Sequence, residues 1–301
     1  MTSDSLTVVI CNWGTPDLTI RSANAVLADG VPAERVVVVD NGSEDDSYAR
    51  FQLELADCEL VRLEENIGFA RASNVGAGKL PGDAYLFVNN DAFVERPGSV
   101  DALLAALGDE RVGVAAPRIL NPDLTLQPTV VPISSPLVEL VRASGVSRLL
   151  PNAVQPSWST HWDHAEAREI QAVNGAVLLV RGRAWKQLGG FSERAYMYAE
   201  DLDLCWRARL GGWKVWFTPM SEFVHLGNVA SGRHWSSPQR ADMIGRSEAD
   251  MIRTHMSRPS AALTLGFISA GLAGRWLVST ATGRREAAAS LRGGLRGYLG
   301  R

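Results

Sequence analysis

The sequence predicts an α/β fold in which a mostly parallel sheet is flanked by helices and followed by a C-terminal helical extension. Over residues 6–91, short apolar runs rich in β-branched residues alternate with segments that carry helix-start signals. Polar residues follow the strongest of these runs. With 301 residues, 46% of them hydrophobic, the chain can bury one large core or two smaller ones.

The first elements follow in order from these signals. Residues 6–11 form a run typical of a strand that is covered on both faces. Thr15 is expected to cap a helix that has Pro16 in its first turn and reaches about Ala28. A second buried strand is expected at 35–40. A strand, a helix and a strand at this spacing predict parallel pairing through a right-handed crossover.

The pattern continues less regularly after the second strand. Four further strands are expected at 59–63, 84–88, 112–115 and 176–180, and two further helices are expected, one that starts at the acidic run 44–46 and one at 69–79. Residues 117–172 show no clean period.

Charge and cysteine content narrow the functional class. A net charge of −3 and a pI near 6.0 provide no basic face for neutralising phosphates, so no nucleic-acid partner is expected. The three cysteines, Cys11, Cys58 and Cys205, are expected to be buried thiols of a reducing compartment. The N-terminus lacks the basic start and the long apolar run of a signal peptide, so a cytoplasmic location is expected.

Two acids stand directly after apolar strands. Asp40 ends the second strand, and Asp91 follows the strand at 84–88. Ligands bind at the carboxyl ends of strands in open α/β sheets, so both side chains are expected to face one crevice. Hard oxygen ligands of this kind suit Mg²⁺ or Mn²⁺ shared with substrate phosphate. An Asx-turn at Asp40 and a helix N-cap at Asp91 are the structural alternatives.

A crowded acidic segment is the second chemical signal. Glu200, Asp201 and Asp203 are expected to begin a helix, where the helix dipole favours acids. That explanation does not account for Met197-Tyr198 immediately before them, nor for the glycine-rich 189–191, which we interpret as a mobile approach to a pocket.

Five short motifs occur in a characteristic order. They are Val39-Asp40-Asn41-Gly42-Ser43, Glu65-Asn66-Ile67-Gly68-Phe69-Ala70, Asn89-Asn90-Asp91, Gly189-Gly190-Phe191 and Glu200-Asp201-Leu202-Asp203-Leu204-Cys205-Trp206-Arg207. In this order the chain resembles the inverting GT-A glycosyltransferases of family 2, especially bacterial rhamnosyltransferase-like members, over about residues 6–235.

The resemblance implies a nucleotide-diphosphate sugar donor bound at the strand ends. It places Asp40 near the base or ribose, and it implies that the remaining donor-binding residues are Asn41, Asn66, Asn89, Asn90 and Asp91. Asn89 stands where the family has the first acid of its Asp-x-Asp metal motif, which leaves Asp91 as the one carboxylate there. His225 matches a histidine that completes the metal site in some relatives, with a structural histidine as the alternative.

The resemblance also implies the catalytic step. Asp201 matches the family's general base, which removes a proton from the acceptor hydroxyl as that oxygen attacks the anomeric carbon opposite the diphosphate. Glu200 and Asp203 are near enough in sequence to take this role instead. Repulsion among the three carboxylates is expected to raise the pKa of at least one of them.

Residues 158–164 contain two tryptophans together with His161 and His164, which suggests a lid on the acceptor side. The two histidines also allow a zinc site, but no cysteine or second ligand pair lies nearby in the sequence.

The C-terminal segment differs in charge from the rest of the chain. From Arg258 onward it holds seven arginines and one acid. Its apolar stretch, 261–274, is shorter than the about 20 residues of a spanning helix, so we expect the tail to lie on an anionic membrane surface. Gly293, Gly294 and Gly297 weaken the prediction of a helix there, and a hairpin packed on the body is the alternative.

Together these observations predict a catalytic domain at 1–235, with a nucleotide-binding part to about 116 and an acceptor part after it, and a basic helical tail at 236–301. The expected activity is metal-dependent transfer of a sugar, expected to be rhamnose, to a cell-envelope glycan or lipid-linked acceptor at the inner face of the plasma membrane. A nucleotidyltransferase that forms nucleotide sugars is one alternative, but it would need a glycine-rich basic loop where 11–16 has none. A non-catalytic carbohydrate-binding protein is the other, and it would not need Asp91 and Asp201 together.

Overall fold

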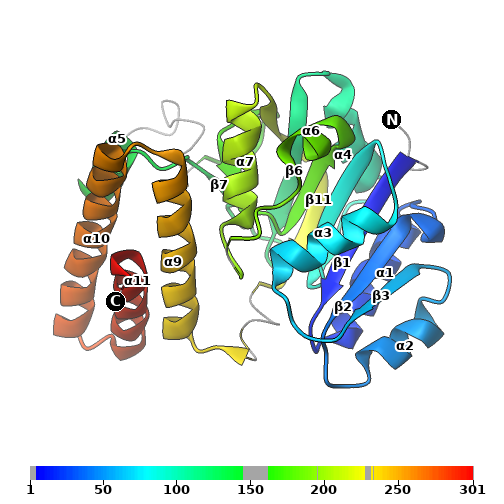
Figure 1. Ribbon diagram of the computed structural model, residues 1–301, viewed down its shortest axis with the longest axis horizontal. Helices are drawn as coiled ribbons and strands as arrows, with labels where there is room; N and C mark the ends of the chain where they lie inside the picture. The colour runs from blue at the N-terminus through cyan, green and yellow to red at the C-terminus, as the bar shows by residue number, and fades with distance from the viewer. Residues whose placement is uncertain (1–4, 145–161, 195, 228–231, 233, 301) are drawn as a thin grey trace. The chain divides into compact units, whose positions relative to one another are not determined.

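The structure is a computed structural model that describes residues 5–144, 162–194, 196–227, 232 and 234–300 (Figure 1). The described residues form two compact units. The sheet unit contains 5–131, 163–194, 196 and 200–227, and the helical unit contains 132–144, 162, 197–199, 232 and 234–300.

A central sheet with flanking helices makes up the sheet unit. Its strands are β1 (Leu6–Asn12), β2 (Val36–Asn41), β3 (Glu59–Leu63), β4 (Ala84–Asn89), β5 (Ala92–Val94), β6 (Val112–Leu120), β8 (Arg168–Ile170), β10 (Val177–Arg181) and β11 (Lys214–His225). Its α-helices are α1 (Pro16–Ala28), α2 (Ser47–Glu54), α3 (Phe69–Lys79), α4 (Ser99–Ala105), α6 (Gly182–Leu188) and α7 (Glu200–Leu210). A separate two-stranded sheet pairs β7 (Val130–Val131) with β9 (Ala172–Val173).

The sheet combines a parallel half with a mixed half. The strand order is β3-β2-β1-β4-β10-β6-β11-β5, and β8 also pairs with β11. β3, β2, β1 and β4 are parallel, as the spacing of strands and helices predicted. β10 lies between β4 and β6 and is antiparallel to both. The α/β class is therefore confirmed, with one reversed strand at its centre.

Alternating burial explains why the valine run of β2 forms a central strand. Val36 and Val38 are fully buried and belong to the same core cluster as Ile20 and Ala23 of α1. Side chains of a strand alternate between the two faces of its sheet. Val37 and Val39 therefore face the opposite side, and both are also fully buried. A strand that is covered on both faces needs an unbroken apolar run.

The parallel half brings three polar strand ends together. In the strand registers, Asn12 of β1 lies opposite Asp40 of β2, and Cys11 of β1 lies opposite Asn89 of β4. All three strands point the same way, so the residues that end them lie at one edge of the sheet. This edge carries the candidate site.

The helical unit has its own packing. Its helices are α5 (Pro136–Ser144), α9 (Ser237–His255), α10 (Arg258–Ala281) and α11 (Arg285–Leu299). α9 begins with a capping box formed by Ser236 and Gln239. Within this unit α11 packs along both α9 and α10, and α5 packs on α10 (Figure 1).

The helical tail expected from the sequence is present in α11 in spite of its glycines. Residues Arg285–Leu299 are helical, and Gly293 and Gly297 lie on the side that faces α9. A Cβ at Gly293 would overlap the carbonyl oxygen of Pro238, and one at Gly297 would overlap that of Asp242. A glycine costs a helix about 1 kcal/mol relative to alanine. Here the missing side chains let two helix backbones touch, which offsets that cost.

α10 is longer than the apolar stretch of the sequence suggested. The helix continues past Arg275 to Ala281 and spans 24 residues. Within the described residues it is the one helix that is long and apolar enough to cross a membrane by length and composition. Leu263, Leu277 and Val278 are exposed on it.

Candidate active site

A buried hydrogen-bond network joins the ends of β1, β2 and β4. The side-chain amide of Asn12 donates to Asp40 Oδ1 at 3.1 Å. Asn12 Oδ1 accepts a hydrogen bond from the hydroxyl of Thr19 at 2.8 Å. The side-chain amide of Asn90 donates to the same hydroxyl at 3.3 Å. All four residues are buried. The network therefore fixes the polar side chains at the edge of the sheet before any ligand binds.

Asp40 keeps one oxygen available within this network. Its Oδ1 accepts hydrogen bonds from Asn12 and from Ser43 Oγ, the latter at 2.5 Å. Its Oδ2 is buried and has no hydrogen-bond partner among the described residues. A buried acceptor is stabilised by a donor. An N–H or O–H group of a ligand would provide one.

Asn41 and Asn66 are brought together and shape a loop. The amide of Asn41 donates to Asn66 Oδ1 at 3.0 Å, and Asn41 Oδ1 accepts from the backbone N–H of Ile67 at 3.0 Å. Asn66 Oδ1 also accepts from the backbone N–H of Gly68 at 2.9 Å. These contacts hold the loop between β3 and α3 against the end of β2.

Asp91 and His225 face each other where β5 pairs with the end of β11. The register of β5 and β11 pairs Ala92 with His225, and Asp91 Oδ1 lies 3.2 Å from His225 Nε2. Asp91 is 5% exposed. The other ring nitrogen, Nδ1, lies 2.7 Å from Oε1 of Gln127.

The hydrogen bonds of Gln127 decide where the imidazole proton lies. Its Nε2 donates to Asn121 Oδ1 at 2.9 Å and to the carbonyl oxygen of His225 at 3.3 Å, so its Oε1 must accept from His225 Nδ1. In a neutral imidazole the Nε2 lone pair then faces Asp91 Oδ1. Two electron-rich atoms at this distance need a proton or a cation between them. The donor set therefore fits a divalent ion held by Asp91 and His225, with Gln127 orienting the ring.

The backbone at 175–176 brings the acidic helix next to this edge. The N–H of Gly175 donates to Asp201 Oδ2 at 2.5 Å. The carbonyl of the next residue, Ala176, accepts from the N–H of Asn89 at 2.9 Å. Asp201 and the start of the Asn89-to-Asp91 segment are thus hydrogen-bonded to two consecutive residues, Gly175 and Ala176.

Asp201 lies in the first turn of α7 and is half-buried. Its Oδ1 accepts from the backbone N–H of Leu202 at 2.7 Å. Burial raises the pKa of the Asp201 carboxyl, and the backbone N–H groups of Gly175 and Leu202 oppose part of that rise. Loss of hydration is the largest cause, whereas the sequence suggested repulsion among carboxylates. A raised pKa suits a group that must take up a proton.

The neighbouring acids differ from Asp201 in their contacts. Asp203 is buried and forms an ion pair with Arg207, at 2.6 Å from Nε. Arg207 also donates to the carbonyl oxygens of Leu188 and Gly190 at 2.8 and 3.0 Å. Asp203 therefore anchors the turn at 189–191. Glu200, the first residue of α7, is half-buried.

That turn is held firmly, unlike the mobile approach expected from its glycines. Phe191 is 3% exposed and packs against Phe87, with ring centroids 4.7 Å apart. Asn74 of α3 accepts from the N–H of Phe191 at 2.9 Å and donates to its carbonyl at 3.0 Å.

The sequence interpretation missed several polar residues of the site. They are Asn12, Thr15, Thr19, Ser43 and Gln127. Asn12 follows an apolar strand just as Asp40 does, so the same signal could have found it. Thr15 does occupy the N-cap position, but its hydroxyl makes no capping bond and instead accepts from Asn90 at 2.6 Å. Gln127 lies in an irregular segment that gave no signal.

The lid expected at 158–164 is not supported where the structure describes it. Residues 158–161, including His161, lie outside the described residues. Trp162 is 9% exposed and His164 is 1% exposed, and the ring of His164 packs edge-on against Phe217. Among the described residues no group of three or more histidine, cysteine or acidic side chains could hold a metal, which leaves the zinc interpretation without a site there.

Comparison with protein families agrees with this geometry. The model described as Glycosyl transferase family 2 matches residues 7–136. An N-acetylglucosaminyl-diphospho-decaprenol L-rhamnosyltransferase of Mycobacterium tuberculosis is 31% identical over 247 residues, which cover 77% of this chain and 79% of the relative. A pre-mycofactocin glycosyltransferase of the same organism is 26% identical over 83% of this chain and 48% of its own length.

Solved structures resemble the fold at lower sequence identity. A mannosyltransferase from Pyrobaculum calidifontis, in complex with GDP-Man and Mn²⁺, aligns with a TM-score of 0.62 at 16% identity, over 99% of this chain and 88% of its own. TarS 1-349 of S. aureus, in complex with UDP-GlcNAc, aligns with a TM-score of 0.52 at 14% identity, over 98% of this chain and 90% of its own.

Proposed function

The chain belongs to glycosyl transferase family 2 and is a nucleotide-sugar glycosyltransferase with a GT-A fold, and from this premise we propose that it transfers rhamnose with inversion to a polyprenyl-diphosphate-linked sugar. The relative from Mycobacterium tuberculosis supports the choice of sugar and acceptor class, because its name specifies both. Solved relatives bound to GDP-Man or UDP-GlcNAc support a nucleotide-diphosphate donor.

One observation carries the proposal. Asp201, a carboxylate with a raised pKa, accepts a hydrogen bond from the N–H of Gly175, and the carbonyl of the next residue, Ala176, accepts one from the N–H of Asn89. A base and a diphosphate-binding edge must lie on opposite sides of one sugar in an in-line displacement. Because Gly175 and Ala176 are consecutive residues, the proposed base and the proposed diphosphate-binding edge lie close together, which supports such a displacement.

In the proposed reaction the acceptor hydroxyl oxygen forms a bond to the anomeric carbon, and the bond from that carbon to the diphosphate oxygen breaks. The electron pair of the broken bond leaves with the diphosphate. Asp201 takes the hydroxyl proton, and one displacement inverts the anomeric configuration. Asp40 would accept a hydrogen bond from the base or ribose through its buried Oδ2.

Asp91 and His225 would hold Mg²⁺ or Mn²⁺, which supplies charge neutralisation for the leaving diphosphate. Two protein ligands suffice, since such ions usually keep waters and substrate phosphate in the remaining positions. Asn89, Asn90, Asn41 and Asn66 are proposed to shape the donor-binding edge, Asn41 and Asn66 by holding the neighbouring loop.

A transfer assay tests the function. With Mn²⁺, deoxythymidine-diphosphate rhamnose and a short-chain polyprenyl-diphosphate N-acetylglucosamine, we expect a disaccharide product with inverted anomeric configuration by NMR. The matched control uses glucose on the same nucleotide and is expected to react at least about tenfold more slowly, since a missing or unpaired hydroxyl contact costs about 1.4 kcal/mol or more. Equal rates with both donors would contradict the choice of rhamnose, and no transfer from any nucleotide sugar would contradict the reaction.

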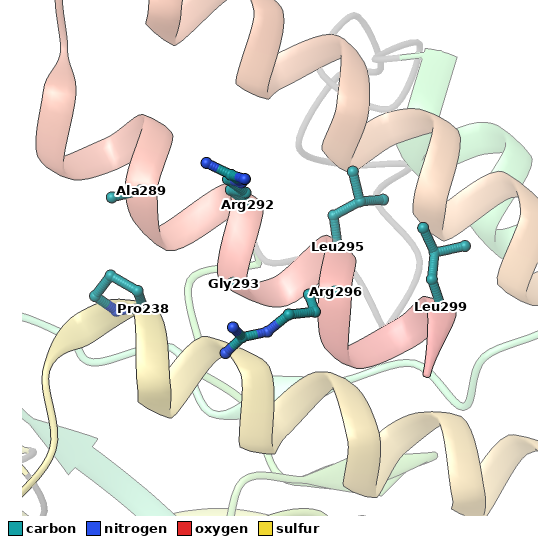
Figure 2. A pocket seen from close by; sticks show the side chains of 7 residues that line it. All are labelled: Pro238, Ala289, Arg292, Gly293, Leu295, Arg296 and Leu299. Atoms are coloured by element: carbon teal, nitrogen blue, oxygen red, sulfur yellow. The ribbon is translucent and has the colours of Figure 1, made fainter. Parts of the chain in front are cut away.

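We infer that the helical unit binds the inner membrane surface, where such an acceptor resides. Leu263, Leu277 and Val278 of α10 expose apolar surface. A groove of about 650 Å³ in the same unit combines arginine and apolar side chains; Figure 2 shows its lining of Pro238, Ala289, Arg292, Gly293, Leu295, Arg296 and Leu299. Apolar side chains beside cations suit the boundary between acyl chains and anionic headgroups.

Neutralising arginines tests this surface. Arg284→Gln, Arg285→Gln and Arg292→Gln together are expected to weaken binding to anionic liposomes, because each arginine near the surface contributes about 1 kcal/mol. High salt should weaken wild-type binding in the same way. Co-sedimentation measures both effects.

The matched control removes the same charge from the sheet unit, through Arg71→Gln, Arg111→Gln and Arg183→Gln. These arginines are also exposed. Binding that falls equally in both triple variants would mean that net charge, and not the helical unit, attracts the membrane.

A further inference from the structure

We propose that a second pocket of the sheet unit, remote from the candidate active site, binds a phosphate or diphosphate group, either as the free anion or as part of a small organic molecule. The pocket has a volume of about 490 Å³, within the range of pockets that hold small organic ligands, and we call it the cationic pocket. The side chains that line it belong to Asp83, Tyr85, Arg181, Arg183, Trp185 and Lys186. This inference goes beyond the proposed function and does not depend on it.

The cationic pocket lies where β4 begins and β10 ends. The two strands are antiparallel neighbours, and their register pairs Ala84 with Arg181 at this end and Val88 with Val177 at the other. Asn89 and the proposed donor-binding edge follow Val88 directly. The length of these two strands therefore separates the cationic pocket from the donor, so both ligands can bind at the same time.

Arg181 has hydrogen-bond donors that the protein leaves unused. The residue is 3% exposed. Its Nε donates to the carbonyl oxygen of Val112 at 2.7 Å, and its Nη2 donates to those of Leu107 and Asp109 at 2.5 and 2.9 Å. An arginine carries five N–H donors, so the two on Nη1 remain, and none of the residues that the structure describes accepts from them. Because Arg181 lines the cationic pocket, acceptors for these donors must come from what occupies the pocket.

The charge of Arg181 also lacks a carboxylate partner. Within the described part of the chain it forms no ion pair, and the nearby carboxylate of Asp109 pairs with Arg111 and Lys214. Burial lowers the pKa of the Arg181 guanidinium and repulsion by Arg183 lowers it further, while attraction to nearby acids offsets part of the fall. A buried charge is costly unless it is paired. An anion in the cationic pocket would provide that pair.

Two exposed cations of α6 add to this charge. Arg183 and Lys186 are three residues apart, so they lie on one side of the helix, and both line the cationic pocket. Arg183 lies 3.7 Å from Glu110, but the two side chains are 66% and 84% exposed, so water weakens this pair. Lys186 forms no ion pair with any described residue. With Arg181 these residues give three cations against one acid, Asp83, and therefore a net charge of +2 in the lining.

The wall of the cationic pocket is already formed where its two segments meet. The N–H of Gly182 donates to the carbonyl oxygen of Asp83 at 2.6 Å. A Cβ at Gly182 would overlap the carbonyl oxygen of Gly82, so this close approach needs a glycine. The ring of Trp185 packs beside that of Tyr85, with centroids 5.6 Å apart. A preformed lining lowers the entropy lost when a ligand binds.

A phosphate group matches this set of donors in geometry and in charge. A guanidinium forms paired hydrogen bonds with two phosphate oxygens, and a lysine ammonium provides a compact positive charge. A phosphate monoester carries about −1.5 to −2 charges at pH 7, which balances the net charge of the lining. A single carboxylate would leave the cationic pocket positive. The ligand class is therefore phosphate or diphosphate.

A titration read at the cationic pocket itself tests the proposal. The indole N–H signal of Trp185, assigned by its absence in Trp185→Phe, is followed by NMR while inorganic phosphate, inorganic diphosphate or thymidine monophosphate is added. EDTA removes divalent ions, and sodium chloride keeps the ionic strength constant. We expect a shift that saturates with a Kd in the millimolar range or below. Tighter binding of thymidine monophosphate than of phosphate would identify an organic phosphate as the ligand, and equal binding would identify the free anion.

Paired variants decide whether the cations of the cationic pocket hold the anion. Arg183→Gln combined with Lys186→Gln is expected to weaken binding by about tenfold or more, because it removes two charged donors. Arg71→Gln combined with Lys79→Gln on α3 is the matched control and should leave the Kd nearly unchanged. All four side chains are exposed, so both double variants are expected to fold. An equal loss in both, or no saturable shift of Trp185 with any of the three anions, overturns the proposal. The measurement is of binding, so its result holds whether or not the chain transfers rhamnose.

Discussion

Asp201→Asn is expected to lower the transfer rate by about 10² to 10⁴-fold, because it removes the proposed proton acceptor and keeps nearly the same volume. Donor affinity should stay within a few-fold of the wild type, since the donor is proposed to bind through Asp40 and Asp91. Initial rates with saturating acceptor and calorimetric titration of the donor measure the two quantities. Near-normal activity would remove the base role from Asp201.

Two neighbouring substitutions serve as controls. Glu200→Gln changes the adjacent carboxylate and should affect the rate far less than Asp201→Asn. Asp203→Asn breaks the ion pair with Arg207, so we expect it to act mainly on stability, by about 1–3 kcal/mol. A melting curve separates that effect from a loss of chemistry.

The pH profile provides an independent check on the same residue. The proposed base works in its ionised form, so the rate is expected to fall as the pH falls through the pKa of Asp201. Burial raises that pKa above the about 3.9 of an exposed aspartate. The acidic limb of kcat should therefore lie at higher pH than for an ordinary aspartate, and it should be absent from the residual rate of Asp201→Asn.

Asp91→Ala is expected to reduce Mn²⁺-dependent donor binding by about 100-fold or more, beyond the about 10- to 100-fold typical of residues that only orient a ligand. It removes the one carboxylate of the Asn-Asn-Asp motif, which is also the carboxylate that faces His225 Nε2. His225→Ala should have a smaller effect, and Gln127→Ala a smaller effect again, because Gln127 acts only through the ring. Calorimetry with and without Mn²⁺ gives this order.

Asn121→Ala extends the series by one further contact, since Asn121 accepts from Gln127. A decline in effect with distance from Asp91 is the signature of a metal-centred site. If Asp91→Ala binds the nucleotide sugar as well as the wild type with Mn²⁺ present, then Asp91 and His225 form an ion pair and hold no ion.

The strands and helices of the parallel half of the sheet could be predicted from the sequence. Apolar runs mark its buried strands, and helix-start and turn residues next to those runs mark where the chain reverses direction. The strand at Glu59–Leu63 and the helix at Phe69–Lys79 have the predicted bounds. The sequence could not predict that β10 runs antiparallel to its neighbours, because a fully buried strand has the same apolar composition whether it is parallel or antiparallel. The position of β5 beside β11 depends on a partner more than 100 residues away along the chain.

The candidate site was predictable as residue types and not as contacts. Asp40 and Asp91 could be selected because strand ends collect ligands, and the structure confirms that β2 and β4 are parallel neighbours of β1. Nothing local to Asp201 indicates that Gly175 will donate to it, since 26 residues separate them. The orientation of His225 by Gln127 likewise bridges 98 residues.

The contact between α11 and α9 has a consequence for where this protein can work. Gly293 and Gly297 bring one helix backbone against the carbonyls of the other, so the two helices fit by shape. Attraction between closely fitted atoms persists in lipid, whereas the gain from hiding leucines from water disappears there. A helix pair joined in this way keeps the same internal geometry on either side of the boundary between water and hydrocarbon. For the proposed transfer from a soluble donor to a lipid-linked acceptor, one packing of these two helices would serve in both surroundings.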